Sequence, residues 1–252
     1  MEVVITGESG RVAAEALAVH LRPGAVLGLA TGSSPLPVYA ELLRRQRNAE
    51  VSFDGVRGFT LDEYIGLPRR HPQSYHSVIR RELTDPAGFP VDGPDGEADD
   101  IPAEAARYEA AIAEAGGIDV QLLGIGTDGH IGFNEPGSSL ASRTRVKTLT
   151  PQTRADNARF FASPDEVPVH VLTQGLGTIL EARHLVMIAT GAGKADAVAA
   201  AVEGPVSASC PASVLQLHPH VTVVVDEEAA ARLVHADYYR FASAHKPSWQ
   251  SW

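Results

Sequence analysis

Hydrophobic and polar positions alternate along this chain in blocks. Short runs that are nearly all apolar are separated by longer stretches in which apolar residues recur every three or four positions. The short apolar runs are typical of parallel strands covered on both faces, and the three-to-four spacing is typical of amphipathic helices. The runs that predict strands are residues 3–5, 25–30, 56–61, 120–126, 184–190 and 220–226.

The stretches between these runs predict helices. They cover residues 11–21, 35–46, 101–116 and the alanine-rich segment 194–204, and the last two end in glycine. Ser34 is the expected N-cap of the second helix, with Pro35 at its first position. This alternation predicts an α/β fold, a Rossmann-like, doubly wound and mostly parallel sheet with helices on both faces.

The chain of 252 residues is expected to form one domain, 1–252. Segment 86–102 is rich in Pro, Gly and Asp, which predicts a surface loop or a domain boundary. One domain is favoured, because the strands on either side of the segment have the same character. The C-terminal residues HKPSWQSW are polar and aromatic. They predict either a free tail or a contact with another subunit.

Charge and composition exclude several classes of protein. The formal net charge of -10 argues against a nucleic-acid partner. No apolar run is long enough to cross a membrane, and residues 1–10 do not resemble a secretion signal. The single cysteine, Cys210, cannot form an internal disulfide and is expected to be a buried structural residue. These features predict a cytoplasmic protein with no membrane partner.

Basic residues are concentrated in one segment of this acidic chain. Segment 142–159 carries a single acid, Asp156, against five basic residues: Arg143, Arg145, Lys147, Arg154 and Arg159. A basic cluster of this kind indicates a small anionic ligand, although any one of these arginines could lie on a solvated helix face. Lys194 is one of only three lysines and lies where a predicted strand gives way to a helix.

Four predicted strands are followed by segments with chemically useful residues. Gly32, Ser33 and Ser34 open a helix, where free N–H groups and the helix dipole can hold a phosphate or serve plain capping. Segment 61–64, LDEY, has adjacent carboxylates that point opposite ways if extended, so one can face a crevice while the other caps or pairs. Lys194 follows a third strand.

Segment 124–135, GIGTDGHIGFNE, follows the fourth strand and is the most informative. It places His130 between Asp128 and Glu135, an arrangement suited to moving protons near neutral pH. The carboxyl ends of parallel strands lie along one sheet edge, so the four segments are expected to share a crevice. They predict acid–base chemistry on a small phosphorylated metabolite. No cysteine pair, HExxH or carboxylate-dense loop indicates a metal.

These motifs resemble the glucosamine-6-phosphate deaminase (glucosamine-6-phosphate isomerase) family nearly from end to end. The likeness rests on ATGSSPLPVY, TLDEYIGLPRRHPQSY, GIGTDGHIGFNEPGSSLASRTRVKTLT, TRADNARFF, TQGLGTILEARHLVMIATGAGKADAV and EGPVSASCPASVLQLHPHVTVVVDE. The resemblance implies that Asp62 is the base that carries a proton between C2 and C1. It also implies that His130 opens the sugar ring while Asp128 and Glu135 orient and tune it.

The resemblance extends to binding residues. It implies phosphate binding by Gly32, Ser33, Ser34, Arg159 and Lys194, although the family motif usually has threonine where this chain has Ser34. It implies a mobile lid over about 145–174. It also implies an allosteric site for N-acetylglucosamine 6-phosphate formed by four residues: Ser138, Arg145, Lys147 and Thr148. A C-terminal tyrosine, to which Tyr238 or Tyr239 could correspond, completes that site in regulated members.

The activity implied by the resemblance converts glucosamine 6-phosphate and water to fructose 6-phosphate and ammonia, a hydrolase and isomerase reaction of amino-sugar catabolism. No metal or organic cofactor is expected, because the substrate carbonyl is the electron sink. The expected partner is a small phosphorylated amino sugar, and a homo-oligomer is left open.

Other functions remain open at this point. The same base could serve a dehydratase acting on N-acetylglucosamine 6-phosphate, since an acetylated amine does not leave readily as ammonia. A non-catalytic sugar-phosphate sensor would keep the anion site without the acid–base set. A phosphosugar lactonase and a Schiff-base enzyme using Lys194 are weaker alternatives.

Overall fold

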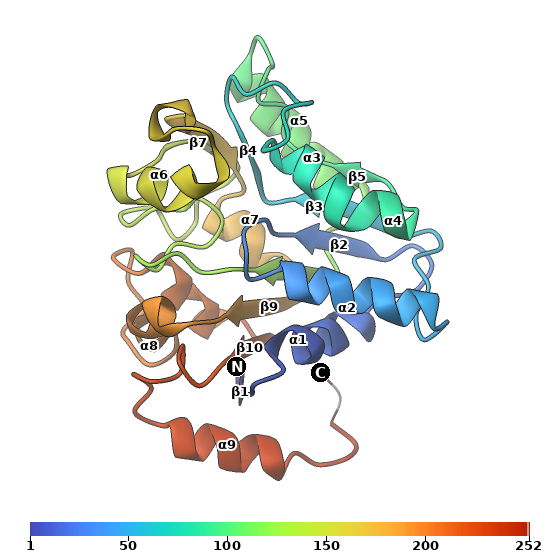
Figure 1. Ribbon diagram of the computed structural model, residues 1–252, viewed down its shortest axis with the longest axis vertical. Coiled ribbons are helices and arrows are strands. Elements are labelled where there is room, and N and C mark those ends of the chain that lie inside the picture. Colours follow the sequence, from blue (N-terminus) through green and yellow to red (C-terminus); the bar gives the residue numbers. More distant parts are fainter. Residues whose placement is uncertain (251) are drawn as a thin grey trace.

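Seven parallel strands form the main sheet of the protein (Figure 1), which we describe from a computed structural model covering residues 1–250 and 252. The strand order is β1-β10-β9-β6-β2-β3-β5. All six predicted strands are present, and β5 lies inside the segment expected to be a loop. The bounds are Glu2–Ile5 (β1), Val26–Leu29 (β2), Arg57–Thr60 (β3), Val91–Asp92 (β5), Val120–Leu123 (β6), His184–Ala189 (β9) and Val221–Val225 (β10).

The order in which the chain visits the strands confirms the doubly wound fold. The chain moves from β2 outward to β3 and β5, then returns to β6 on the other side of β2 and continues to β9 and β10. Right-handed crossovers therefore place the helices before and after this reversal on opposite faces of the sheet. The reversal lies between β2 and β6, which is where ligands bind in open α/β sheets.

The four predicted helices are present, with one correction at the start of the second, whereas the helix at residues 236–244 was not predicted. The second helix begins at Leu36, and Pro35 rather than Ser34 occupies the N-cap position, without a side-chain capping bond. Ser34 is left free to line the cavity described below. The longer helices are Ser9–Ala18 (α1), Leu36–Arg47 (α2), Ile101–Glu114 (α5), Ala195–Val202 (α8) and Ala236–Ala244 (α9). None of the helices described is long and apolar enough to cross a bilayer.

Shorter helical turns complete the connections. They are Tyr75–Ile79 (α3), the π-helical turn Arg80–Thr84 (η1), Asp85–Ala87 (α4), Pro151–Asn157 (α6), Leu176–Leu180 (α7) and the 3₁₀ turns Ala158–Phe160 (η2), Pro164–Glu166 (η3), Ala192–Lys194 (η4) and Pro211–Leu217 (η5).

A second, three-stranded antiparallel sheet was not predicted. Its order is β4-β8-β7, and its strands are Asp62–Tyr64 (β4), His170–Thr173 (β8) and Arg145–Thr148 (β7). Each strand has three or four residues and carries polar or charged side chains, so the apolar pattern that marks the main sheet is missing. The strands β7 and β8 bound almost the whole segment expected to be a lid.

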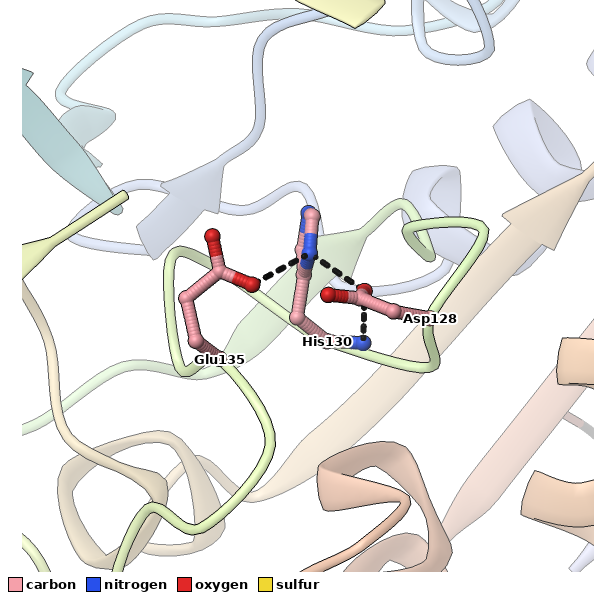
Figure 2. A group of neighbouring side chains, drawn as sticks. All are labelled: Asp128, His130 and Glu135. Carbon is pink, nitrogen blue, oxygen red and sulfur yellow. Dashed lines mark hydrogen bonds and ion pairs between the residues drawn. The ribbon is translucent and has the colours of Figure 1, made fainter. Parts of the chain in front are cut away.

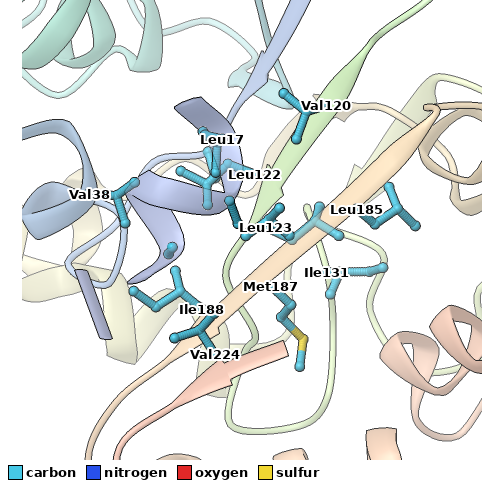
Figure 3. Close-up of a cluster of buried hydrophobic side chains, with 14 of the residues drawn as sticks. Leu17, Val38, Val120, Leu122, Leu123, Ile131, Leu185, Met187, Ile188 and Val224 are labelled. Atoms are coloured by element: carbon cyan, nitrogen blue, oxygen red, sulfur yellow. The ribbon is translucent and has the colours of Figure 1, made fainter. Parts of the chain in front are cut away.

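The main core lies between the sheet and its helices. Figure 3 shows Leu17 of α1 close to Leu122 of β6, with Val38 of α2 to the left and Met187 of β9 lower in the view, all of them buried. Burying each such side chain contributes about 1.5–3 kcal/mol. A smaller cluster under the second sheet contains Tyr64, Leu67, Phe133, Leu149, Val167 and Val171.

The C-terminal tail folds back onto the chain. Trp252 packs against the main core, and the ammonium group of Lys246 lies 4.2 Å from the centre of its ring. Trp249 is exposed. Cys210 is half-buried rather than fully buried, and burial raises the pKa of its thiol.

Gly175 lies in the junction between β8 and α7, and a substitution there tests how tightly the junction is packed. A Cβ at this position would lie 2.0 Å from the Ser142 backbone oxygen, so we expect Gly175→Ala to cost about 1–3 kcal/mol or more. Gly7→Ala is the control, because nothing lies within 4 Å of its added Cβ. Thermal unfolding measures both variants, and equal melting temperatures would contradict this packing.

Candidate active site

A cavity of about 390 Å³ opens at the carboxyl ends of β2, β3, β6 and β9, which are consecutive neighbours in the main sheet. The four segments expected to share a crevice all contribute to it, as does the basic segment. Its lining residues are Ala30, Thr31, Gly32, Ser33, Ser34, Pro35, Leu61, Asp62, Tyr75, Gly124, Ile125, Gly126, Thr127, His130, Gly132, Phe133, Thr153, Asp156, Asn157, Arg159, Phe160, Thr190, Gly193 and Lys194.

His130 is held by two carboxylates behind the cavity wall (Figure 2). Its Nδ1 lies 2.7 Å from Asp128 Oδ1 and 3.6 Å from Glu135 Oε2. The backbone N–H of His130 also donates to Asp128 Oδ1 at 3.2 Å. The ring faces the backbone of Gly126, where a Cβ would lie 2.3 Å from it. These contacts fix the ring and leave Nε2 as the nitrogen free to meet a ligand.

The carboxylates determine the charge of His130. Burial lowers the pKa of this imidazole, but the hydrogen bonds and charges of Asp128 and Glu135 outweigh burial and raise it to about 9. Burial would raise the pKa of Asp128, yet the bond and charge of His130, with Glu135, lower it below the usual range. His130 is therefore an imidazolium at neutral pH.

The same three side chains are the one group of described residues whose ligand atoms lie close enough together to hold a metal ion, within 4.8 Å of one another. A protonated His130 offsets the charge of these carboxylates, with Asp128 Oδ1 at 2.7 Å and Glu135 Oε2 farther away at 3.6 Å.

The adjacent carboxylates of segment 61–64 have separate environments. Asp62 lines the cavity, whereas Glu63 turns away and accepts hydrogen bonds at the start of α3. Its donors are Ser74 Oγ at 2.7 Å and the backbone N–H groups of Tyr75 and His76, each at 3.0 Å. Glu63 thereby fixes the segment that brings Tyr75 to the cavity.

Asp62 is a carboxylate whose proton is easily exchanged near neutral pH. Its side chain is 4% exposed. Burial, assisted by the charge of Glu63, raises its pKa to about 7, while a hydrogen bond from Thr173 and the charge of His130 act in the opposite direction. A carboxylate with a pKa near the working pH is suited to general-base catalysis.

Two cations, Lys194 and Arg159, line the cavity without an acidic partner at ion-pair distance among the described residues. Within residues 1–250 and 252, none of the ion pairs involves Lys194 or Arg159. Arg159 donates to Ser33 Oγ at 3.4 Å, and burial lowers the pKa of Lys194. Together with the turn at Gly32, these groups form a site for an anion.

Comparisons with known proteins identify the family. The family model described as glucosamine-6-phosphate isomerases/6-phosphogluconolactonase matches residues 7–224. This chain belongs to that family. The glucosamine-6-phosphate deaminase of Rhodococcus opacus (strain B4) is 66% identical over the full length of both chains, and that of Streptomyces coelicolor is 61% identical over 99% of each.

Solved structures of the family agree with the fold. A monomeric glucosamine-6-phosphate deaminase is 43% identical, with a TM-score of 0.89 over 92% of this chain and 100% of that one. The 6-phosphogluconolactonase of Trypanosoma cruzi is 22% identical, with a TM-score of 0.71 over 92% of this chain and 97% of that one. The second likeness supports the family fold alone.

The residues expected to form an allosteric site in this family lie outside the cavity. Ser138 is buried, and its hydroxyl donates to the Glu135 backbone oxygen at 2.6 Å. Arg145 donates to Asn134 Oδ1 at 2.8 Å, and the remaining two residues, Lys147 and Thr148, follow it on β7. Their regulatory role stays a prediction.

Sequence reasoning missed several residues that belong to the site. Tyr75, Phe133 and Phe160 line the cavity, and Thr173 contacts Asp62 from the far strand β8. Phe133 and Tyr75 lie within motifs that carry the family resemblance, so the motifs were the available signal. Thr173 also opens one of these motifs, but the motif does not reveal its contact with Asp62, which joins residues 111 positions apart.

The raised pKa of Asp62 predicts that the ionised form of this side chain lowers the free energy of unfolding. Since folding raises this pKa from 3.8 to about 7, the penalty is absent below pH 3.8, grows as pH rises and is complete above about 7, where it reaches about 4 kcal/mol. We expect Asp62→Asn to raise the melting temperature at pH 8, by on the order of 10 °C, and by about a third of that at pH 5.

The matched control is Asp165→Asn, an exposed carboxylate. Calorimetry across pH 4–9 should show a larger gain in stability for Asp62→Asn than for this control. An Asp62→Asn protein no more stable than wild type at pH 8 would contradict the burial of a charged Asp62.

Proposed function

We propose that this chain is a glucosamine-6-phosphate deaminase, which converts glucosamine 6-phosphate and water to fructose 6-phosphate and ammonia. The observation that carries the proposal is a single cavity with a near-neutral carboxylate at Asp62, an imidazolium at His130 and two unpaired cations. The full-length likeness to deaminases supports the same activity.

The phosphate binds first in this mechanism. Lys194 and Arg159 supply positive charge, and the turn at Gly32, Ser33 and Ser34 supplies hydrogen-bond donors ahead of α2. An anion here gives the two cations the partners they lack among the described residues. A phosphate bound there would hold the sugar in the cavity that Asp62 and His130 also line.

His130 then opens the pyranose ring. Its Nε2 donates a proton to the ring oxygen, and the neutral imidazole takes the proton of the C1 hydroxyl, which leaves an aldehyde. Asp128 and Glu135 stabilise the imidazolium before and after the step. A positioned acid or base of this kind contributes about 10²–10⁴ in rate.

Asp62 carries out the isomerisation. The C1 aldehyde makes the C2 proton acidic, Asp62 removes it, and the enol that forms is reprotonated at C1. This leaves an imine at C2, to which water adds before ammonia departs. The carbonyl accepts the electrons throughout, so the reaction calls for no metal or organic cofactor.

Segment 145–174 acts as a lid in this proposal, within a single domain. Support comes from its position: it begins on β7, continues through α6, which lies beside β7 (Figure 1), and ends one residue past β8. It contributes five residues to the cavity wall: Thr153, Asp156, Asn157, Arg159 and Phe160. Closing on the phosphate would exclude water from the cavity until the imine has formed. A homo-oligomer stays a prediction.

The activity is tested by incubating the purified protein with glucosamine 6-phosphate and, separately, with its N-acetylated form. We expect ammonia and fructose 6-phosphate from the first and no ultraviolet-absorbing dehydration product from the second. Asp62→Asn should lower kcat by at least about 10³-fold while sugar-phosphate binding persists, and Asp165→Asn should retain activity.

The opposite results would identify the alternatives. A chromophore from the acetylated sugar would indicate the dehydratase, and binding of both sugars without turnover would indicate a sensor. Near-normal ammonia release by Asp62→Asn would refute the assignment of the base.

The anion site makes a separate prediction. Lys194→Met removes one charged hydrogen-bond donor to the phosphate, so we expect kcat/KM to fall by about 10–100-fold, mostly through KM. Lys246→Met is the matched control, because Lys246 pairs with Glu2 at 2.9 Å and does not line the cavity. Steady-state kinetics measures both variants. A KM for Lys194→Met equal to that of Lys246→Met would contradict a role for Lys194 in phosphate binding.

A further inference from the structure

The carboxylate of Asp62 is held by one hydrogen bond among the described residues. Its donor is the hydroxyl of Thr173, whose Oγ1 lies 3.3 Å from Asp62 Oδ2. Thr173 is completely buried. In the antiparallel pairing of β4 with β8, Asp62 and Thr173 are directly opposite each other, so their side chains project from the same face of the second sheet. The base is therefore held from across a strand pair.

The direction of this bond is set by a neighbouring amide. The backbone N–H of Phe133 donates to Thr173 Oγ1 at 3.1 Å. Since that lone pair is occupied, the hydroxyl proton is left for Asp62 Oδ2 or for the Gln174 backbone oxygen at 3.4 Å. An ionised carboxylate is the stronger acceptor of the two. The amide of Phe133 thus directs the Thr173 hydroxyl toward the base.

Gly132 allows its loop to lie close to Thr173 and Asp62. Its φ of +54° is in the left-handed region, and a Cβ there would lie 3.0 Å from Thr173 Oγ1 and 3.6 Å from Asp62 Oδ2. The absent side chain lets the 131–134 loop lie directly against the Thr173–Asp62 pair. The same loop is joined to the end of β8 by Asn134, which donates to the Gln174 backbone oxygen at 2.8 Å.

We propose, on the basis of the proposed function, that Thr173 is a positioning residue for the base: its hydroxyl, aimed by the Phe133 amide, holds Asp62 Oδ2 and leaves Oδ1 to take the C2 proton. The bond has two consequences. It fixes the carboxylate plane against the substrate, and it favours the ionised form, since Thr173 is one of the groups that lower the pKa of Asp62. Thr173 does not itself touch the reacting carbon in this role.

The position of Thr173 also links the base to the lid. Thr173 is the last residue of β8, and in the second sheet it lies between Asp62 of β4 and Arg145 of β7. The hydroxyl therefore belongs to the same strand pair that bounds segment 145–174. The base is fully oriented when β8 is in register with β4.

The test replaces the hydroxyl while keeping the shape of the side chain. For Thr173→Val we expect kcat to fall by about 10–100-fold with KM changed less than about twofold, and the acidic limb of the kcat/KM profile to move up by about one pH unit. Thr173→Ser keeps the hydroxyl and should restore both the rate and the limb. A residue that acts only through packing would not move the limb.

Thr222→Val is the matched control. Thr222 is a buried strand threonine whose hydroxyl contacts a titratable side chain, His184 Nε2 at 2.9 Å, near the amino ends of β10 and β9. It should lose stability without any shift of the pH profile. If Thr173→Val does not fold, Thr173→Cys supplies a weaker donor of similar size and should give a smaller shift in the same direction.

A second readout needs no substrate and so separates this proposal from the proposed function. The pH at which the stabilisation by Asp62→Asn levels off reports the pKa of Asp62, and it should rise when the comparison is made in the Thr173→Val or Thr173→Cys background. An unchanged levelling-off pH, or a serine variant as impaired as the valine variant, overturns the proposal.

Discussion

Parallel pairing of β9, β6, β2 and β3 is the constraint on which the rest of the structure depends. These four strands are consecutive neighbours, and the chain reverses direction across the sheet between β2 and β6. Their carboxyl ends therefore meet at one edge and bring together loops as far apart in sequence as Ala30 and Lys194. The apolar strands supply the free energy of burial, and the polar loops that follow them are positioned without contributing to the core.

The same loops carry charges that do not stabilise the folded chain. Asp62 is buried with a raised pKa, and Lys194 is partly buried with a lowered one, so both lose hydration on folding. His130 differs, because Asp128 and Glu135 compensate for its burial. In the proposed mechanism, a bound phosphate would offset the penalty at Lys194, and the deprotonation step would use the unfavourable charge of Asp62. The charged groups are thus in place before the substrate binds, so its binding free energy is not used to order them.

Pattern alone predicted the main sheet because its strands are continuous apolar runs, and it predicted the convergence of the four loops because parallel strands share an edge. It missed the second sheet because β4 and β7 read as DEY and RVKT, which resemble turns and charged surface. Alternation showed that Asp62 and Glu63 would face opposite ways. Only the fold decided which one faced the cavity, since Ser74 and the α3 amides bind Glu63. Ser34 illustrates a further limit, because a capping residue and a ligand-binding residue have the same local signature.

The proposed acid–base set is divided between the two sheets. Asp62 belongs to β4, whereas His130 follows β6 of the main sheet. The distance between them depends on bonds that join the sheets: Gln174 N to Leu61 O at 2.8 Å, and Asn134 Nδ2 to Gln174 O at 2.8 Å. These are short bonds in a buried region, where relaxation is limited. A change that shifts β8 would therefore move the base relative to the ring-opening group without altering either residue.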